Sequence, residues 1–335
     1  MNVSLRKSAR RTAAAALTLA TAVSLAACSS DDSDNSGSSP ASSSATDSFP
    51  VSVPTKFGDV EIKEQPTKVV ALGWGDAEIA TELGVQPVGA TDWLGFGGEG
   101  LSPWATATYD KAPEILDTQT VDYEKIAKLD PDLILDVRDS GDGDTNKRLS
   151  EIAPTVSVPE DADGFTTTWD KQVEMISTAL GEKAKGDKLV SQVNDRITEV
   201  KDAHPQWADK SATVLAKTSV EWGAYVKGDA RADLVSALGF KPNAEISKLV
   251  KPGEFYVSLS AENLTKADSD VVIGFPIGDV GSIADDAQWK TLTAVKDGHA
   301  IVTDKELSNA ISLGTPAAML HALDLLTPKL EDATK

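Results

Sequence analysis

The sequence predicts an α/β protein made of two doubly wound lobes, each with a parallel sheet, joined by a long α-helix. Continuous apolar runs such as Lys68–Gly73 and Asp132–Val137 indicate strands covered on both faces, and helical stretches alternate with them. The phrase Asp122–Leu135 recurs without a gap as Ser260–Ile273. Strands that alternate with helices form parallel sheets, and the repeat indicates that the two lobes are variants of one unit.

Each half of the folded chain repeats the same order of elements. The helix starts have capping residues, such as Asp76 and Asp122. In both halves a predicted helix ends at a glycine, and the chain turns at a proline a few residues later. The first half has predicted strands at 68–73, 132–137 and 155–159, with helices at 77–84, 123–129 and 146–153. The second half has predicted strands at 212–219, 270–275 and 300–304 and a final helix at 315–330.

The segment between the halves is predicted to be helical throughout. One helix extends to about Gly181, and a longer one runs from about Glu182 to His204, with apolar residues at the helical period. At 1.5 Å per residue the second helix is roughly 33 Å long, enough to reach from one lobe to the other. A single stiff helix between the lobes predicts only a small hinge motion.

The first 50 residues differ in character from the rest. A basic start and the apolar stretch Ala13–Ala27 predict a secretion signal, and Leu25–Cys28 resembles the lipobox of bacterial lipoproteins, which implies lipid attachment at Cys28. The alternative is an ordinary signal peptide with an incidental cysteine. The domains are therefore predicted as a signal peptide (1–27), a disordered tether (28–50), an N-terminal lobe (51–165), bridging helices (166–205) and a C-terminal lobe (206–335).

The charge of the chain restricts its partners. The formal net charge is −20, and removal of residues 1–27, which contain four basic and no acidic residues, gives −20 − 4 = −24. Such a field repels nucleic acid and anionic lipid. We therefore expect no nucleic-acid partner, membrane contact through the lipid anchor only, and a position on the extracytoplasmic face of the cell membrane.

The ordered phrases from about residue 56 to 330 resemble one family. They include "PTKVVALGWGDAEIATELG", "DYEKIAKLDPDLILDV", "LSEIAPTV" and "WKTLTAVKDGHAIV". They are similar to substrate-binding lipoproteins of ABC importers, in the branch that takes up ferric siderophores, haem and cobalamin. The resemblance implies two Rossmann-like lobes bridged by a long helix, a monomer that binds a metal chelate between the lobes, and delivery to a permease dimer served by a separate ATPase.

Glu124 and Glu262 occupy equivalent places in the repeat, each in the first turn of a predicted helix. A negative charge there complements the helix dipole, which is a sufficient structural explanation. In the family that the chain resembles, one glutamate at this place on each lobe docks onto arginines of the permease. Both interpretations remain open from the sequence.

The ligand pocket is expected at the carboxyl ends of the strands, where open α/β sheets leave a crevice. Aromatic residues follow or flank these strand ends, and exposed clusters of rings mark binding surfaces. The predicted ligand-binding rings are Trp74, Trp93, Trp104, Trp222, Tyr225, Phe255, Tyr256 and Phe275. Trp169 and Trp289 are expected in cores because they lie in helical stretches, and Trp207 is expected at the surface.

Two arginines complete the predicted ligand site. Arg138 stands just beyond the strand 132–137, where the family often has an arginine that binds chelate oxygens, while Arg231 is a second candidate that a surface ion pair would explain equally well. With so few arginines in an acidic chain, a neutral or cationic ferric hydroxamate is favoured over a ferric tricatecholate. No resident cofactor or metal is expected. Haem and cobalamin remain alternative ligands.

Two other classes of function are disfavoured by the sequence. The three histidines, His204, His299 and His321, are not brought together by any predicted element, and no complete calcium loop is present, which argues against a bare metal ion as ligand. No G-x-S-x-G elbow, phosphate-binding loop or HExxH helix appears, which argues against an enzyme that uses the cleft.

Overall fold

The computed structural model describes residues 48–162, 164–251 and 254–335. The predicted signal peptide, Cys28 and most of the predicted tether therefore lie outside the described residues. Phe49 packs against the hydrophobic core of the first lobe, and strand β1 begins at Val51. Phe49 therefore belongs to the fold, although the range 28–50 was expected to be a disordered tether. In the ranges described, none of the helices is both long enough and apolar enough to span a membrane.

The first lobe is built on a five-stranded sheet in which every pair of neighbours is parallel, in the order β5-β4-β3-β6-β7. An antiparallel hairpin, β1 (Val51–Thr55) and β2 (Gly58–Ile62), precedes it. The strands are β3 (Val69–Ala71), β4 (Gly89–Thr91), β5 (Glu114–Leu116), β6 (Leu133–Asp136) and β7 (Thr155–Ser157), and the helices are α1 (Asp76–Glu82), α2 (Tyr123–Lys128) and α3 (Gly143–Ser150).

The second lobe has a mixed sheet in the order β11-β9-β8-β12-β13, with β10 also pairing with β8. Its strands are β8 (Ser211–Lys217), β9 (Trp222–Tyr225), β10 (Lys241–Pro242), β11 (Tyr256–Leu259), β12 (Val271–Pro276) and β13 (Ala300–Val302). Its helical segments are α6 (Ala230–Ala237), α7 (Ala244–Ser247), η2 (Ala261–Ala267), η3 (Ile283–Asp285), η4 (Trp289–Thr291), α8 (Thr293–Asp297) and α9 (Lys305–Leu313).

This second sheet departs in part from the expected parallel arrangement. Strands β8, β12, β13 and β10 are parallel, whereas β9 is antiparallel to both β8 and β11. The cause is local, because the turn between β8 and β9 closes as a hairpin in which the Thr218 N–H donates to the Glu221 carbonyl at 2.9 Å. Because of this hairpin, Trp222 lies in strand β9 and not in the loop where the sequence predicted it.

The repeat in the sequence corresponds to a structural repeat of the two lobes. Asp132 accepts hydrogen bonds from the N–H and hydroxyl of Thr67, and Asp270 accepts the equivalent pair from Ser211. In both lobes the aspartate thus ties the start of one strand to that of its neighbour. The paired positions Ile126 and Leu264 are both buried. The predicted two-lobed α/β fold is confirmed.

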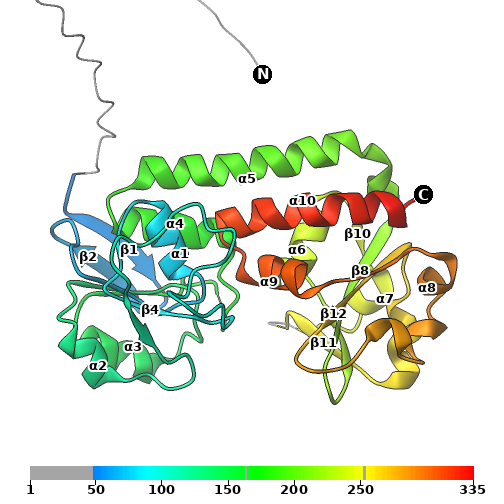
Figure 1. Ribbon diagram of the computed structural model, residues 1–335, viewed down its shortest axis with the longest axis horizontal. Helices are drawn as coiled ribbons and strands as arrows, with labels where there is room; N and C mark the ends of the chain where they lie inside the picture. Colours follow the sequence, from blue (N-terminus) through cyan, green and yellow to red (C-terminus); the bar gives the residue numbers. More distant parts are fainter. Residues whose placement is uncertain (1–47, 163, 252–253) are drawn as a thin grey trace, which may run out of the picture. The chain divides into compact units, whose positions relative to one another are not determined.

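Helix α5 (Lys183–Ala203) carries the chain from the first lobe to the second (Figure 1). Helix α4 (Trp169–Ala179) packs in the core of the first lobe, and α10 (Pro316–Ala333) packs in the core of the second. The break between α4 and α5 lies at Gly181, whose φ of 69° suits a residue without a side chain. With 21 residues, α5 is about 32 Å long. Near its start Lys185 donates to the Leu83 carbonyl of the first lobe at 2.9 Å, and near its end Val200 belongs to the second core.

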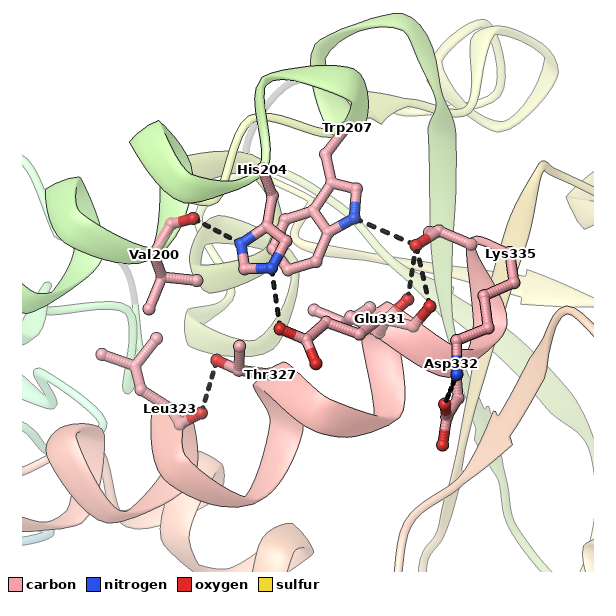
Figure 2. A network of polar contacts seen from close by, with 10 residues as sticks. Val200, His204, Trp207, Leu323, Thr327, Glu331, Asp332 and Lys335 are labelled. Atoms are coloured by element: carbon pink, nitrogen blue, oxygen red, sulfur yellow. Dashed lines mark hydrogen bonds and ion pairs between the residues drawn. The ribbon is translucent and has the colours of Figure 1, made fainter.

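The far end of α5 is fixed to α10 by a polar network (Figure 2). The His204 ring is hydrogen-bonded through Nδ1 to the Val200 carbonyl at 2.7 Å and through Nε2 to Glu331 at 2.8 Å, and Trp207 Nε1 donates to the Thr334 hydroxyl. Trp207 is fully buried, with its ring stacked between His204 and Phe240. The expectation of a surface position for Trp207 is therefore wrong, because the last turn of α5 and the end of α10 cover it.

Candidate functional site

Two tryptophans at neighbouring strand ends form the centre of the first lobe's site. Trp74 follows β3 and Trp93 follows β4, and their rings stack at 5.8 Å between centroids with an interplanar angle of 1°. The edge of Phe165 meets Trp93 at 5.5 Å. Trp93 Nε1 donates to the Leu72 carbonyl at 2.9 Å, which fixes the tilt of its ring. The structure thus brings together two of the predicted rings.

Arg138 extends this cluster to the second lobe. Its guanidinium lies 5.1 Å from the Trp74 ring, and Nη1 donates to the Leu313 carbonyl at the end of α9 at 2.8 Å. The side chain is only 8% exposed. Burial and the nearby positive charge of Arg231 lower the pKa of Arg138 to about 10, so it remains charged at neutral pH.

Arg231 is the corresponding group of the second lobe. It stands in the first turn of α6, pairs with Asp229 at 2.8 Å, and donates through Nη2 to the Ser312 hydroxyl at 3.0 Å. Its guanidinium lies 4.3 Å from the Tyr225 ring, and Tyr225 meets the edge of Tyr256 at 5.4 Å. The ion pair that the alternative expected is therefore present, but it is mostly buried and does not lie at the surface.

The two arginines therefore meet at one turn, Ser312–Leu313, where α9 ends. The C-terminal end of a helix carries a partial negative charge that attracts cations. This explains why a carbonyl of the turn accepts a hydrogen bond from a guanidinium. All described residues belong to one compact unit, which includes this contact between the lobes. A cavity of about 260 Å³ opens beside it, lined from both lobes by Arg138, Trp169, Gly228, Asp233 and Met319 among others.

Several donors in this cluster are buried without a hydrogen-bond partner among the described residues. They are Trp74 Nε1, Arg231 Nε and Tyr256 Oη. Buried polar groups are normally paired, and an unpaired one costs about 1–3 kcal/mol. Unpaired donors from both lobes around a guanidinium pair fit a site that accepts the oxygen atoms of a ligand. Because these atoms are covered, a ligand reaches them only after the rings move apart.

The backbone around the cluster is shaped for close approach. Gly223 lies beneath Tyr256, and a side-chain carbon at that position would collide with the tyrosine ring. Phe165 has a φ of 62°, a left-handed conformation that is uncommon for a residue with a side chain and that recurs at functional sites. The sequence reasoning missed Phe165, because a phenylalanine between Gly164 and a run of threonines carries no periodic signal.

Trp104 and Phe255 occupy other positions. Trp104 stacks on His321 of α10 at 4.9 Å and receives the edge of Phe96, and it lines a separate cavity of about 360 Å³ with residues of α9. It contacts the second lobe, and among the described residues its ring pairs with those of Phe96 and His321 and not with the Trp74–Trp93 pair. Phe255 is 37% exposed just before β11 and makes no ring contact within the described ranges.

Two predicted ligand rings are buried in the core. Trp222 is 1% exposed and stacks on Trp289 at 5.8 Å, and Phe275 is 1% exposed within the core that includes α5 and α10. The expectation that Trp222 forms the pocket is wrong, because its side chain faces the interior of the second lobe. Phe275 is also buried, but its ring lies 6.0 Å from the Arg231 guanidinium and so borders the arginine cluster. Trp289 is buried as expected, whereas Trp169 is only partly buried and borders the cavity between the lobes.

Glu124 and Glu262 are both exposed, in the first turns of α2 and η2. Neither carboxylate has an ion pair or hydrogen-bond partner within the ranges that the structure describes. The second segment is a 3-10 helix and not an α-helix. The two positions are therefore equivalent and accessible.

The histidines lie apart, each engaged elsewhere. His299 is bonded to the Ala333 carbonyl and His321 to Glu306, while His204 belongs to the network of Figure 2. In the described part of the chain, no group of three histidine, cysteine or carboxylate side chains has the geometry to hold a metal ion.

Two α/β lobes, a connecting helix and a ring-lined arginine pair at the lobe contact define a ligand-binding protein of the two-lobed class. Residues 69–307 match the model of the periplasmic binding protein family, and the chain belongs to that family.

Its similarity to individual proteins is distributed over most of the chain. It is 28% identical over 271 residues to the iron(3+)-hydroxamate-binding protein FhuD of Bacillus subtilis, covering 74% of this chain and 76% of that protein. The crystal structure of a periplasmic solute binding protein from Mycobacterium smegmatis superposes with a TM-score of 0.72 at 30% identity, covering 85% and 99% of the chains. Staphylococcus aureus SirA in complex with staphyloferrin B gives 0.71 at 25% identity, covering 85% and 99%.

Proposed function

We propose that this protein is the substrate-binding lipoprotein of an ABC importer, and that it captures a ferric siderophore between its lobes and delivers it to the permease. The observation that carries the proposal is the meeting of Arg138 and Arg231, one from each lobe, among rings with unpaired donors. The similarity to an iron(3+)-hydroxamate-binding protein and to a protein solved in complex with staphyloferrin B supports this ligand class.

The local charge favours a chelate of low net charge. Asp229 neutralises Arg231, and Asp76 also lies close enough to act on Arg138, so the two guanidinium groups do not create a strong excess of positive charge. A triply negative tricatecholate would be poorly balanced there. A ferric hydroxamate, held by stacking on Trp74 and Trp93 and by hydrogen bonds from the arginines, fits better.

Delivery and attachment are the other parts of the proposal. Glu124 and Glu262, exposed and equivalent on the two lobes, dock onto a two-fold symmetric permease dimer. The lipid on Cys28 keeps the binder, as a monomer, on the extracytoplasmic face of the membrane near that permease, and a separate ATPase supplies the energy.

Fluorescence quenching titrations test the ligand assignment. The purified protein is titrated with a ferric trihydroxamate, a ferric tricatecholate and haem, and Arg138→Lys is titrated in parallel. We expect the trihydroxamate to bind most tightly and Arg138→Lys to bind it at least tenfold more weakly, because lysine loses the planar fork of donors. Tightest binding of the tricatecholate or haem would overturn the hydroxamate assignment, and binding of none of the three would overturn the proposed function.

A further inference from the structure

A small acidic pocket lies beside the ring cluster of the first lobe. It has a cavity volume of about 30 Å³ and sits at the carboxyl ends of β3, β4, β5 and β6. Its lining includes Trp93, Asp117, Asp122, Asp136 and Asp139. A cavity needs about 10–15 Å³ to hold one water molecule, so this one has room for a group of the size of an ammonium head.

Asp136 is the unusual member of this lining. It is 4% exposed, at the end of β6, and its carboxylate has no ion pair or hydrogen-bond partner within the described ranges. Burial raises its pKa well above the usual value, and the nearby acids Asp139 and Asp76 raise it further, with no cation acting in the opposite direction. Burying a carboxylate without a partner costs free energy, and a cation beside it would offset that cost. Asp136 is therefore suited to bind a cation.

The other acids of the pocket already have local roles. Asp122 caps α2 by accepting from the Lys125 N–H, Asp117 accepts from the Gln119 and Thr120 N–H groups, and Asp139 accepts from Ser140. The start of α3 is capped by Asp142, outside the pocket. The positive ends of both helices are therefore complemented by their own caps, which argues against an anion as occupant.

Trp93 provides the connection to the ligand site. Its ring lines the pocket and also stacks on Trp74, above which Arg138 lies. An indole face attracts a cation in addition to the carboxylate. A bare divalent ion is a poor candidate, because no group of three ligating side chains in the described part of the chain has metal geometry.

We propose that Asp136 and Trp93 form a subsite for a primary ammonium group carried by the ligand, so that the preferred substrates are ferric chelates with a cationic amine arm. This inference rests on the proposed function. The chelate lies against Trp74 and Trp93 near the lobe contact, and its arm passes the edge of Trp93 to reach the carboxylate of Asp136.

The test compares two ligands that differ only at the arm. One is a linear ferric trihydroxamate ending in a primary ammonium, and the other is the same chelate with that amine acetylated. We expect the wild-type protein to bind the cationic chelate about tenfold more tightly, the effect of one carboxylate and one partly desolvated cation–π contact. Asp136→Asn should reduce the preference to within about twofold and leave the affinity for the acetylated chelate unchanged. Asp144→Asn, an exposed site on α3 outside the pocket, is the matched control and should keep the full preference.

The outcomes separate this inference from the proposed function. Equal binding of the two chelates by the wild-type protein overturns the subsite and leaves the siderophore assignment intact. A preference that persists in Asp136→Asn also overturns it. Failure of the wild-type protein to bind either chelate overturns both. The wild-type comparison needs no variant, so it decides the matter even if Asp136→Asn does not fold.

Discussion

Glu82 offers a quantitative test of the contact between the lobes. It ends α1 of the first lobe, and its carboxylate accepts from the Ala317 N–H in the first turn of α10. One turn earlier, Glu78 accepts from the Thr315 hydroxyl at 2.5 Å. Burial, together with the nearby charge of Glu78, raises the pKa of Glu82 from 4.5 to about 7. Oε2 of Glu82 is buried and has no hydrogen-bond partner within the ranges described.

The magnitude follows from this pKa. A rise from 4.5 to about 7, at ~1.4 kcal/mol per pH unit, corresponds to about 3 kcal/mol. The fold favours the neutral carboxyl, so this stabilisation is fully present below pH 4.5 and is lost as the pH rises through 7. Glutamine keeps the shape without the charge. Glu82→Gln should therefore match the wild type near pH 4.5 and exceed it by up to about 3 kcal/mol at pH 8.

Urea unfolding at both pH values measures the effect. The free energy of unfolding is extrapolated to water for wild type and Glu82→Gln, and the exposed Glu124→Gln serves as a control that should show no such dependence. Equal stability of Glu82→Gln and wild type at pH 8, or the same gain at both pH values, would refute the assignment of the buried charge to Glu82.

Three further changes test the core, the docking surface and the anchor. Trp222→Ala should lower the free energy of unfolding by about 3–5 kcal/mol in denaturant titrations, because it empties a core site against Trp289, and it should leave chelate affinity within twofold. The double substitution Glu124→Ala and Glu262→Ala should abolish uptake of the radiolabelled chelate by cells while affinity changes less than threefold; lost affinity would contradict a docking role. Cys28→Ser should move the protein from the membrane fraction to the medium, and retention on membranes would exclude Cys28 as the anchor.

The elements that the sequence predicted well are those with strong local signals. Apolar runs in the sequence predicted strands β3, β6, β8 and β12, and Gly181 predicted the break between α4 and α5. The alignment of Asp132 with Asp270 predicted the shared architecture of the lobes, because each side chain ties neighbouring strands at the same place. These features depend on residues close in sequence or on an internal copy.

The candidate site was predictable only in part. Trp74, Trp93, Arg138, Tyr225, Arg231 and Tyr256 do gather at the lobe contact. Trp222 does not, because the direction of a strand side chain depends on register, and the β8–β9 hairpin, which no sequence pattern predicted, sets that register. Phe275 is buried in the core, with its ring 6.0 Å from the Arg231 guanidinium. The partners on Ser312 and Leu313 come from a turn 80 or more residues away, at a contact that no local pattern encodes.

The single passage of the chain from one lobe to the other, through α5, has an evolutionary consequence. A recombination event within the codons for this helix exchanges a complete lobe between related genes, because the backbone does not return to the first lobe afterwards. The contacts that a hybrid must preserve include the hydrogen bond from Arg138 to the Leu313 carbonyl, that from Thr315 to Glu78, and the stacking of Trp104 on His321. Ligand preference can therefore be inherited in halves, with the Trp74–Trp93 stack of the first lobe and the Tyr225–Arg231 group of the second lobe drawn from different ancestors.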